Sequence, residues 1–400
     1  MLVCFLAKAL GQSDSLEMAV KGLVELIQEP QPAKGEPFPD INGPNPDDKV
    51  CIVGAGPAGI HMAQSLKKRN FEDIVIFEKT DRVGGKSYDV SVNGTVNYMS
   101  TVFVLANYFS TLVPLAREYG IGDLVKAPSP NIFKYNSGSQ PGSKLRTIQY
   151  ILDQLQSSTD LDALSALKRL FLDIGRYVKI HREMFGAFKG ELMPKPSMEV
   201  FHRIRGTFLE FLQRENLKTL VPLFLLSHTM PGYGYIDEIG ALYGLMWNDP
   251  VYLLSVCLRT VGKDEDPLSV YTFRNGFERI WKTIVEVEKL KINFNSNIFK
   301  ITRNSKGATI YLNDIYHKRE ESCDFLIWAA PVDEYLKTVD FDIDELMIFK
   351  PMHSVALSST LVKVTSDIRN GPFTGFLENI RKKTEHGVLV EVSSSGITRA

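Results

Sequence analysis

The residues best suited to bind a ligand are the glycines of the run Gly54-Ala55-Gly56-Pro57-Ala58-Gly59. Gly54 allows a tight turn, Gly56 leaves space where a pyrophosphate would lie, and Gly59 lets a helix pack closely on a sheet. Pro57 suits the first turn of that helix, because no backbone donor is needed there and its φ is already fixed. A helix that begins here offers free N–H groups and a positive dipole end to phosphate oxygens. The run therefore predicts a phosphate-binding loop.

Two strands and a carboxylate complete the pattern around this loop. Val50–Val53 is a short apolar run before the glycines, a helix-like pattern covers residues 57–69, and Ile74–Phe77 is a second apolar run. Glu78 follows about 20 residues after the last glycine, the position of a carboxylate that binds ribose hydroxyls. The order of strand, glycine turn, helix, strand and acid predicts a dinucleotide site. A plain β-turn-α unit without a nucleotide is the alternative.

A second glycine pair, Gly84-Gly85, comes soon after the carboxylate and is flanked by Arg82 and Lys86. Paired glycines let the backbone approach a ligand, and the two cations can face phosphate charge. Together with Lys79, these residues extend the predicted cofactor site. Here the chain resembles the flavin-containing amine oxidase superfamily, in which an R-x-G-G-R/K-x motif completes the FAD site. The resemblance implies FAD rather than NAD. The spacing of the motifs alone does not distinguish these two cofactors.

The resemblance continues more diffusely to about residue 365. Residues 145–265 are mostly helical by pattern, with amphipathic runs at 160–183 and 198–212, and would form a substrate-domain insert. A glycine turn, a helix, a strand meander and an apolar strand follow between residues 270 and 331. In the superfamily the residue at Ile298 contacts the cofactor through its backbone. The resemblance also places Lys363 near flavin N5, and a solvated lysine on an alternating strand is the alternative.

Other segments give local predictions. Two strands joined at Asn93-Gly94 are expected at residues 88–92 and 95–98, followed by a helix over residues 100–119. After this hairpin the superfamily carries an acidic residue and a Gly-Ala pair near the flavin ring. This chain has Asn97-Tyr98-Met99-Ser100 in that place, a departure from the family's pattern.

We therefore predict an α/β fold, with an FAD-binding Rossmann-type (glutathione-reductase-like) domain and a largely helical substrate-domain insert. The predicted FAD-binding domain is discontinuous, at 48–135 and 265–335, and the substrate or cap domain takes 136–264 and 336–400. Residues 1–47 would be an N-terminal helix, at 14–28, and a proline-rich linker.

Members of the superfamily end with a further glycine-rich segment and helix that complete the FAD domain. The sequence shows no such segment, so we expect the C-terminal part to be missing and the chain to be a fragment. Within the superfamily, residues 43–63 and Gly232-Tyr233-Gly234 most resemble the branch with polyunsaturated fatty acid isomerase and β-cyclopiazonate dehydrogenase.

Composition argues against several other classes. The 46 basic and 47 acidic residues give a formal charge of −1, which does not recruit nucleic acid. The histidines lack metal-ligand spacing, no G-x-S-x-G elbow occurs, and no run of 18 apolar residues predicts a transmembrane helix. The N-terminus only weakly resembles a secretory signal, which slightly favours a cytoplasmic location. We also expect neither a disulfide framework nor a zinc site, because the four cysteines are scattered at Cys4, Cys51, Cys257 and Cys323.

Three functions are compatible with these residues. The first is an FAD-dependent oxidoreductase of the amine-oxidase type, which moves a hydride from a small amine-like substrate to flavin N5, with Lys363 ordering a water. The second is a redox-neutral, flavin-dependent isomerase of an unsaturated fatty acid, and the third is a truncated, non-catalytic nucleotide-binding protein. A small-molecule substrate is the expected partner, and the oligomeric state is not predicted. Four aromatic residues either line a substrate wall or pack the helical core: Tyr233, Tyr235, Tyr243 and Trp247.

Overall fold

The computed structural model describes residues 43–105, 111–127, 131–134, 143–187, 195–229, 231–253, 270–313 and 318–352, with Gly22, Glu25, Met193 and residues 358–361, 374–375 and 391–392. The predicted helix at 14–28 lies outside the described residues, except for Gly22 and Glu25, which are helical. Lys363 lies outside them as well.

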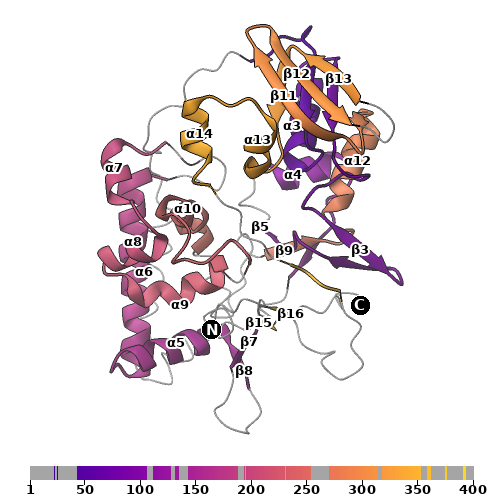
Figure 1. Ribbon diagram of the computed structural model, residues 1–400. Helices are drawn as coiled ribbons and strands as arrows, with labels where there is room; N and C mark the ends of the chain where they lie inside the picture. The colour runs from indigo at the N-terminus through magenta and orange to yellow at the C-terminus, as the bar shows by residue number, and fades with distance from the viewer. Residues whose placement is uncertain are drawn as a thin grey trace.

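A four-stranded parallel sheet occupies the upper part of the molecule in Figure 1. All three strand pairs are parallel. Strands that are buried on both faces read as nearly continuous apolar runs, as VCIV and IVIF do here. The parallel sheet confirms the predicted α/β fold class. The strand order is β10 (Lys291–Asn293), β2 (Ile74–Phe77), β1 (Val50–Val53) and β14 (Phe325–Trp328).

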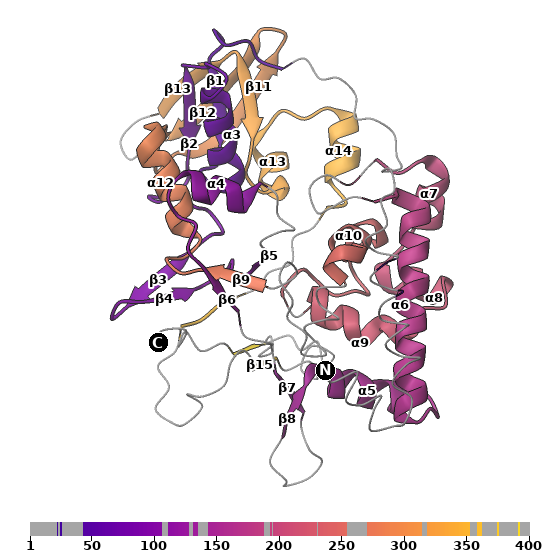
Figure 2. The same ribbon diagram turned by 180° about the vertical axis from the view of Figure 1, so that it is seen from behind.

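Different elements cover the two faces of this sheet (Figures 1 and 2). Val50 and Ile52 share a buried cluster with helices α3 (Pro57–Lys67) and α12 (Glu278–Glu288). Cys51 and Val53 belong to a second cluster, which lies under an antiparallel meander. Because successive side chains of a strand point to opposite faces, β1 contributes to both cores, at about 1.5–3 kcal/mol per buried aliphatic side chain. The meander consists of β11 (Asn297–Asn304), β12 (Gly307–Asn313) and β13 (Lys318–Cys323).

Cys51 and Cys323 form a disulfide between this sheet and the meander. Cys51 lies in β1 and Cys323 ends β13; both side chains are buried, and their Cα atoms are 5.8 Å apart. The expectation that the scattered cysteines form no disulfide framework is therefore wrong for this pair. Spacing along the chain does not reveal the bond, because the fold brings together two strands that are 272 residues apart.

A helical body lies below and beside the sheet (Figure 2). Its helices share one large buried cluster that includes Tyr177, Phe208 and Phe224. The predicted helix at 160–183 is confirmed as α6, where the Asp162 side chain accepts hydrogen bonds from the Leu164 and Ser165 N–H groups. The boundaries between domains stay a prediction. The elements are α5 (Thr147–Ser158), α6 (Ala163–Phe185), α7 (Met198–Arg203), α8 (Phe208–Arg214), η1 (Lys218–Leu220), α9 (Val221–Phe224), η2 (Leu225–Thr229) and α10 (Ala241–Trp247).

The amphipathic run at 198–212 forms two helices rather than one. Gly206 lies between α7 and α8 with a φ of +84°, a conformation that favours glycine. Thr207 then begins α8 through a capping box with Glu210, so the chain turns where the apolar period continues.

Three smaller sheets contain the remaining strands. The hairpin of β3 (Asp89–Val92) and β4 (Thr95–Tyr98) is confirmed, with Asn93 and Gly94 at positive φ. The predicted helix at 100–119 is only partly right, because β5 pairs with β9 and, among the described residues of this range, α4 alone is helical. These elements are β5 (Val104–Leu105), α4 (Leu112–Glu118), β6 (Leu124–Lys126) and β9 (Val270–Phe273), and, in the last sheet, β7 (Asn131–Lys134), β8 (Ser143–Arg146), β15 (Thr374–Gly375) and β16 (Glu391–Val392).

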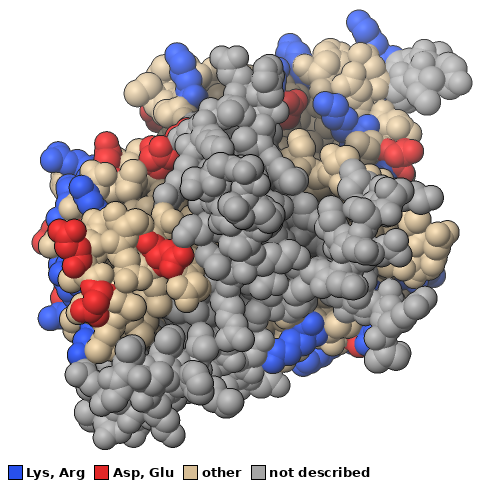
Figure 3. Space-filling view, turned by 90° about the horizontal axis from the view of Figure 1, so that it is seen from below, with Lys and Arg blue, Asp and Glu red and all other residues tan. Residues whose placement is uncertain are grey.

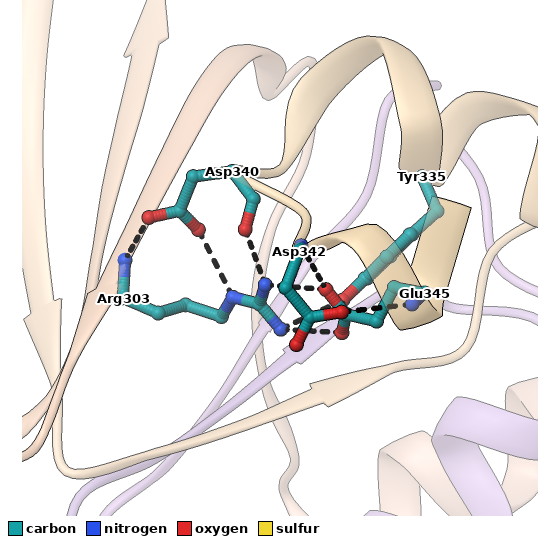
Figure 4. Close-up of polar contacts among 5 residues, drawn as sticks. All are labelled: Arg303, Tyr335, Asp340, Asp342 and Glu345. Carbon is teal, nitrogen blue, oxygen red and sulfur yellow. Dashed lines mark hydrogen bonds and ion pairs between the residues drawn. The ribbon is translucent and has the colours of Figure 1, made fainter. Parts of the chain in front are cut away.

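Arg303 fixes the segment after β14 to the meander (Figure 4). From β11 its guanidinium donates to Asp340 Oδ1 at 2.9 Å and to both oxygens of Glu345 at 2.7 Å. The Tyr335 hydroxyl accepts from Arg303 and donates to Glu345. The network thereby joins three elements: β11, α13 (Val332–Thr338) and α14 (Ile343–Phe349).

The surface and the helices give two further observations. Acidic and basic side chains both occur on each side of the face in Figure 3, which agrees with the balanced composition. Among the described residues, no helix combines the length and the apolar character that crossing a bilayer requires.

Candidate dinucleotide site

The predicted phosphate-binding loop lies between β1 and α3. Gly54 has a φ of +106°, and its N–H donates to the Phe77 carbonyl of β2 at 2.8 Å. A Cβ at Gly54 would lie 3.1 Å from the Ala329 carbonyl oxygen, just after β14. The tight turn predicted for Gly54 is therefore present, and it is enclosed by the ends of three strands.

Gly56 and Gly59 meet very different surroundings. Among the described residues, a Cβ at Gly56 would have only the Gly85 Cα within 4 Å, at 3.8 Å, so these residues leave the space beside Gly56 open. A Cβ at Gly59 would lie 2.0 Å from the Gly54 carbonyl oxygen and 3.3 Å from Ile52 Cγ2. Gly56 is the N-cap of α3 and Pro57 stands in its first turn. The loop thus has room for a ligand at Gly56, while Gly59 allows the helix to approach the strand and turn.

Glu78 directly follows β2 and lies beside the loop. Its Oε2 accepts from the Ala55 N–H at 2.8 Å, and its Oε1 accepts from the N–H and the hydroxyl of Thr80, also at 2.8 Å. The side chain is only 9% exposed. These donors hold a buried carboxylate at the edge of the glycine loop, where the predicted ribose contact requires it.

The second glycine pair lies directly against the first loop. Gly84 and Gly85 have φ values of +100° and +51°, and the Gly84 N–H donates to the Ala55 carbonyl at 2.9 Å. A Cβ at Gly85 would lie 2.9 Å from the Gly56 Cα. Apart from Gly56, the glycines of both motifs are therefore required by backbone conformation or by close approach. We call the two loops, residues 54–59 and 82–87, the glycine cradle.

The predicted cations are placed differently from one another. Arg82 donates to the Gly85 carbonyl at 2.7 Å and stacks on the Tyr88 ring, with its Cζ 4.5 Å from the ring centroid. Its guanidinium is thus turned toward its own loop, and a direct phosphate contact stays a prediction. Lys79 and Lys86 are exposed.

Ile298 and Lys363 complete the predicted set. The Ile298 N–H donates to the Ser296 carbonyl at 3.1 Å, and the Ser296 N–H donates to the Glu78 carbonyl at 2.8 Å. Ile298 therefore lies close to the Glu78 end of β2, although its backbone contact with a cofactor stays a prediction. Lys363 lies outside the described residues, so its place near flavin N5 stays a prediction.

The cradle fits the pyrophosphate and ribose of a dinucleotide. It offers open space beside Gly56, the N-terminus of an 11-residue helix, and a carboxylate at the strand end. N–H groups in the first turn of a helix have no intrahelical acceptor and bind phosphate oxygens.

Comparisons with known proteins agree with this geometry. A model of the NAD(P)-binding Rossmann-like domain matches residues 52–119. The structure of the CLA-producing fatty acid isomerase from P. acnes superposes with a TM-score of 0.54 and 22% identity, covering 77% of this chain and 64% of that one. Wild-type putrescine oxidase bound to putrescine gives a TM-score of 0.53 and 16% identity, over 76% of this chain and 63% of that one. The chain has the fold of the flavin-containing amine oxidase superfamily.

Curated proteins from two organisms are similar to this chain in sequence. Polyenoic fatty acid isomerase of Ptilota filicina is 22% identical over 280 residues, which are 66% of this chain and 52% of that protein. Tryptophan 2-monooxygenase of Agrobacterium tumefaciens (strain Ach5) is 28% identical over 94 residues, 21% of this chain and 12% of that protein. The chain therefore spans about half the length of the isomerase and a smaller part of the monooxygenase.

The predicted aromatic wall is a packed cluster in the helical body. The Tyr233 and Trp247 ring centroids are 3.8 Å apart, and His228 lies 5.5 Å from Tyr243. Tyr235 packs against the buried helical core, while Tyr243 stays 39% exposed. Core packing therefore accounts for Tyr235, and a substrate contact of the other rings stays a prediction.

Sequence reasoning missed the polar residues behind these rings. The segment Leu225–Thr229 is a π-helix, a distortion that is frequent at functional sites. His228 Nε2 donates to the Tyr233 carbonyl at 3.0 Å, and Nδ1 accepts from the Asn248 amide at 3.3 Å. Burial lowers the pKa of His228 to about 4, so the ring is neutral near pH 7. The sequence LFLLSHT at residues 223–229 contains no pattern that predicts this π-helix.

Proposed function

We propose that the chain binds FAD in the glycine cradle and serves flavin-dependent hydride transfer. The observation that carries this proposal is the contact of the two loops at Gly56 and Gly85, with open space beside Gly56 and a held carboxylate at Glu78. The superfamily fold supports FAD over NAD.

The residues of the site have separate roles in this proposal. Glu78 accepts hydrogen bonds from the ribose hydroxyls, and the N-terminus of α3 binds the pyrophosphate. Gly56 keeps the phosphate position free, and the backbone at Ile298 borders the cofactor. Bound FAD would supply a hydride acceptor at flavin N5. The protein's own share is to hold the cofactor, exclude water and orient the substrate carbon.

For the substrate we propose an unsaturated fatty acid that is isomerised without net oxidation. This choice is supported by the two fatty acid isomerases, which align over 66% and 77% of the chain. In such a reaction a hydride leaves one carbon and returns to another, so no external electron acceptor is consumed. A large apolar core in the helical body is compatible with a lipid tail.

Oxidation of an amine is the second candidate. The similarity to putrescine oxidase over 76% of the chain and the local similarity to tryptophan 2-monooxygenase favour it. Here the two electrons leave the substrate and pass to dioxygen or another acceptor.

FAD binding is tested by the visible spectrum of the purified chain and by titration with FAD, with NADH as the competing ligand. We expect flavin absorbance near 450 nm, a value typical of flavins in general, and weak or no NADH binding. A colourless protein that gains no absorbance from added FAD would contradict the proposal and favour a non-catalytic chain.

The two substrate classes are separated by anaerobic mixing of the FAD-loaded chain with either substrate. An isomerase converts a polyunsaturated fatty acid to a conjugated product with no loss of flavin absorbance at steady state. An amine oxidase instead loses its flavin absorbance in proportion to the amine added. Stoichiometric bleaching by the fatty acid would exclude the redox-neutral reaction.

A further inference from the structure

A buried carboxylate that the sequence did not single out lies beneath the glycine cradle. Glu278 is the first residue of α12 and is 5% exposed. Its Oε1 lies 3.6 Å from Arg82 Nη1, and its Oε2 lies 3.2 Å from Lys282 Nζ. A carboxylate this buried needs such partners, since an unpaired charge in the interior is strongly unfavourable.

The backbone of Glu278 is held independently of its side chain. Its N–H donates to Asp89 Oδ2 at 2.8 Å, so β3 fixes the first turn of α12. Gly276 makes this approach possible, because a Cβ there would lie 2.2 Å from the same carboxylate oxygen. The position of the Glu278 carboxylate is therefore set by the fold and does not depend on a flexible loop.

From this position Glu278 contacts the second loop of the cradle in two ways. A Cβ at Gly84 would lie 3.1 Å from Glu278 Cγ, so the side chain packs directly against the Gly84 backbone. Its charge pairs with Arg82, and Arg82 in turn donates to the Gly85 carbonyl at 2.7 Å. The Gly85 backbone then meets Gly56 at the place proposed for the pyrophosphate.

We propose that Glu278 is a positioning residue for cofactor binding, which acts through Arg82 to hold the loop 82–87 against the phosphate-binding loop 54–59. This inference rests on the proposed function for the identity of the ligand, FAD. It also assigns Arg82 a role different from direct phosphate binding. The guanidinium orients the Gly85 peptide, and Glu278 keeps the guanidinium in place.

The test compares FAD and ADP dissociation constants of the wild-type chain with those of Glu278→Gln, Arg82→Gln and the double variant. We expect Glu278→Gln to weaken both ligands by about tenfold, as expected when a charge-assisted contact is lost. The double variant should be little weaker than either single variant, because coupled residues are not additive. Glu278→Asp should recover part of the affinity.

Lys282→Ala is the matched control, because Lys282 pairs with the same carboxylate but none of its described contacts involves the cradle. It should leave the dissociation constants within about twofold. Independent, additive effects of Glu278→Gln and Arg82→Gln, or an equal loss in Lys282→Ala, would overturn the positioning role.

A ligand-free measurement separates this inference from the proposed function. Hydrogen exchange of the Gly84 N–H, which donates to the Ala55 carbonyl, reports the position of the loop without any cofactor. We expect faster exchange at Gly84 in Glu278→Gln and unchanged exchange in the strands of the parallel sheet. If the wild-type chain binds neither FAD nor ADP, the proposed function fails; if exchange at Gly84 does not change, the positioning inference fails.

Discussion

Gly56 and Gly85 approach each other so closely that a Cβ on Gly85 would lie 2.9 Å from the Gly56 Cα, whereas a Cβ on Gly56 would lie 3.8 Å from the Gly85 Cα. The first distance is too short for real Cβ contacts and the second is ordinary van der Waals contact. The two glycines therefore serve different purposes, one in joining the loops and one in leaving ligand space.

Gly56→Ala should lose cofactor and keep its fold. The new methyl group enters open space, and Gly56 already has a φ of −79°, which alanine adopts without strain. We expect the melting temperature to change by at most a few degrees and FAD binding to weaken by more than about tenfold, because the methyl occupies the phosphate position. FAD titration and circular dichroism together measure both effects.

Gly59→Ala in the same helix is the matched contrast. Its Cβ would lie 2.0 Å from the Gly54 carbonyl oxygen, so the turn or the helix has to move. We expect a loss of stability of about 1–3 kcal/mol, typical of overpacking, in urea unfolding. Equal stability of Gly59→Ala and the wild type would show that the helix does not pack on the turn as described.

The buried Asp249 carboxyl should make the stability of the fold depend on pH. Oδ1 accepts from the Val251 and Tyr252 N–H groups, while Oδ2 is buried with no hydrogen-bond partner among the described residues. Burial raises the pKa of this carboxyl from 3.8 to about 7. A raised pKa means that the neutral form is favoured in the fold, so its stabilising effect is complete below about pH 4 and is lost as the pH rises to 7.

Asp249→Asn removes this charge and keeps the acceptor for the two N–H groups. The variant should gain stability over the wild type between pH 4 and pH 7, by at most about 4 kcal/mol at pH 8, since each pKa unit corresponds to about 1.4 kcal/mol. Urea unfolding at pH 4.5 and pH 8 provides the comparison. A constant difference between the two proteins at both pH values would contradict the buried, unpaired Oδ2.

Arg303 should control the titration of Glu345. Its hydrogen bonds lower the pKa of Glu345 from 4.5 to about 2. A lowered pKa means that the ion pair stabilises the fold above about pH 4.5 and that this contribution is lost as the pH falls toward 2. In Arg303→Ala we expect the Glu345 pKa to return toward 4.5, measured by NMR titration, together with faster hydrogen exchange in α13 and α14. Lys337→Ala, which removes an exposed pair with Glu334, should change neither measurement.

The local sequence pattern was sufficient to predict the glycine cradle. It was not sufficient to predict the residues that hold the cradle in place. Val50–Val53, Ile74–Phe77 and the turn at Asn93-Gly94 were predicted because their apolar runs and turn residues act within a few positions. Glu278 contacts the cradle from a helix almost 200 positions later in the chain. The periodicity of apolar residues within one element cannot predict such a long-range contact. The same limit applies to Gly206, where one residue at positive φ divides a continuous amphipathic pattern.

The disulfide between Cys51 and Cys323 can be tested by peptide mapping and by its effect on stability. Digestion of the unreduced protein should yield one cross-linked pair of peptides that contain these two residues, detected by mass spectrometry and lost on reduction. Because the bond closes a loop of 272 residues, its removal in Cys51→Ala/Cys323→Ala should lower the free energy of unfolding by about 2–5 kcal/mol. The reduced wild type should then unfold at the same urea concentration as the double variant. Free Cys51 and Cys323 in the oxidised protein, trapped by alkylation after unfolding, would show that the two strands are held by packing alone.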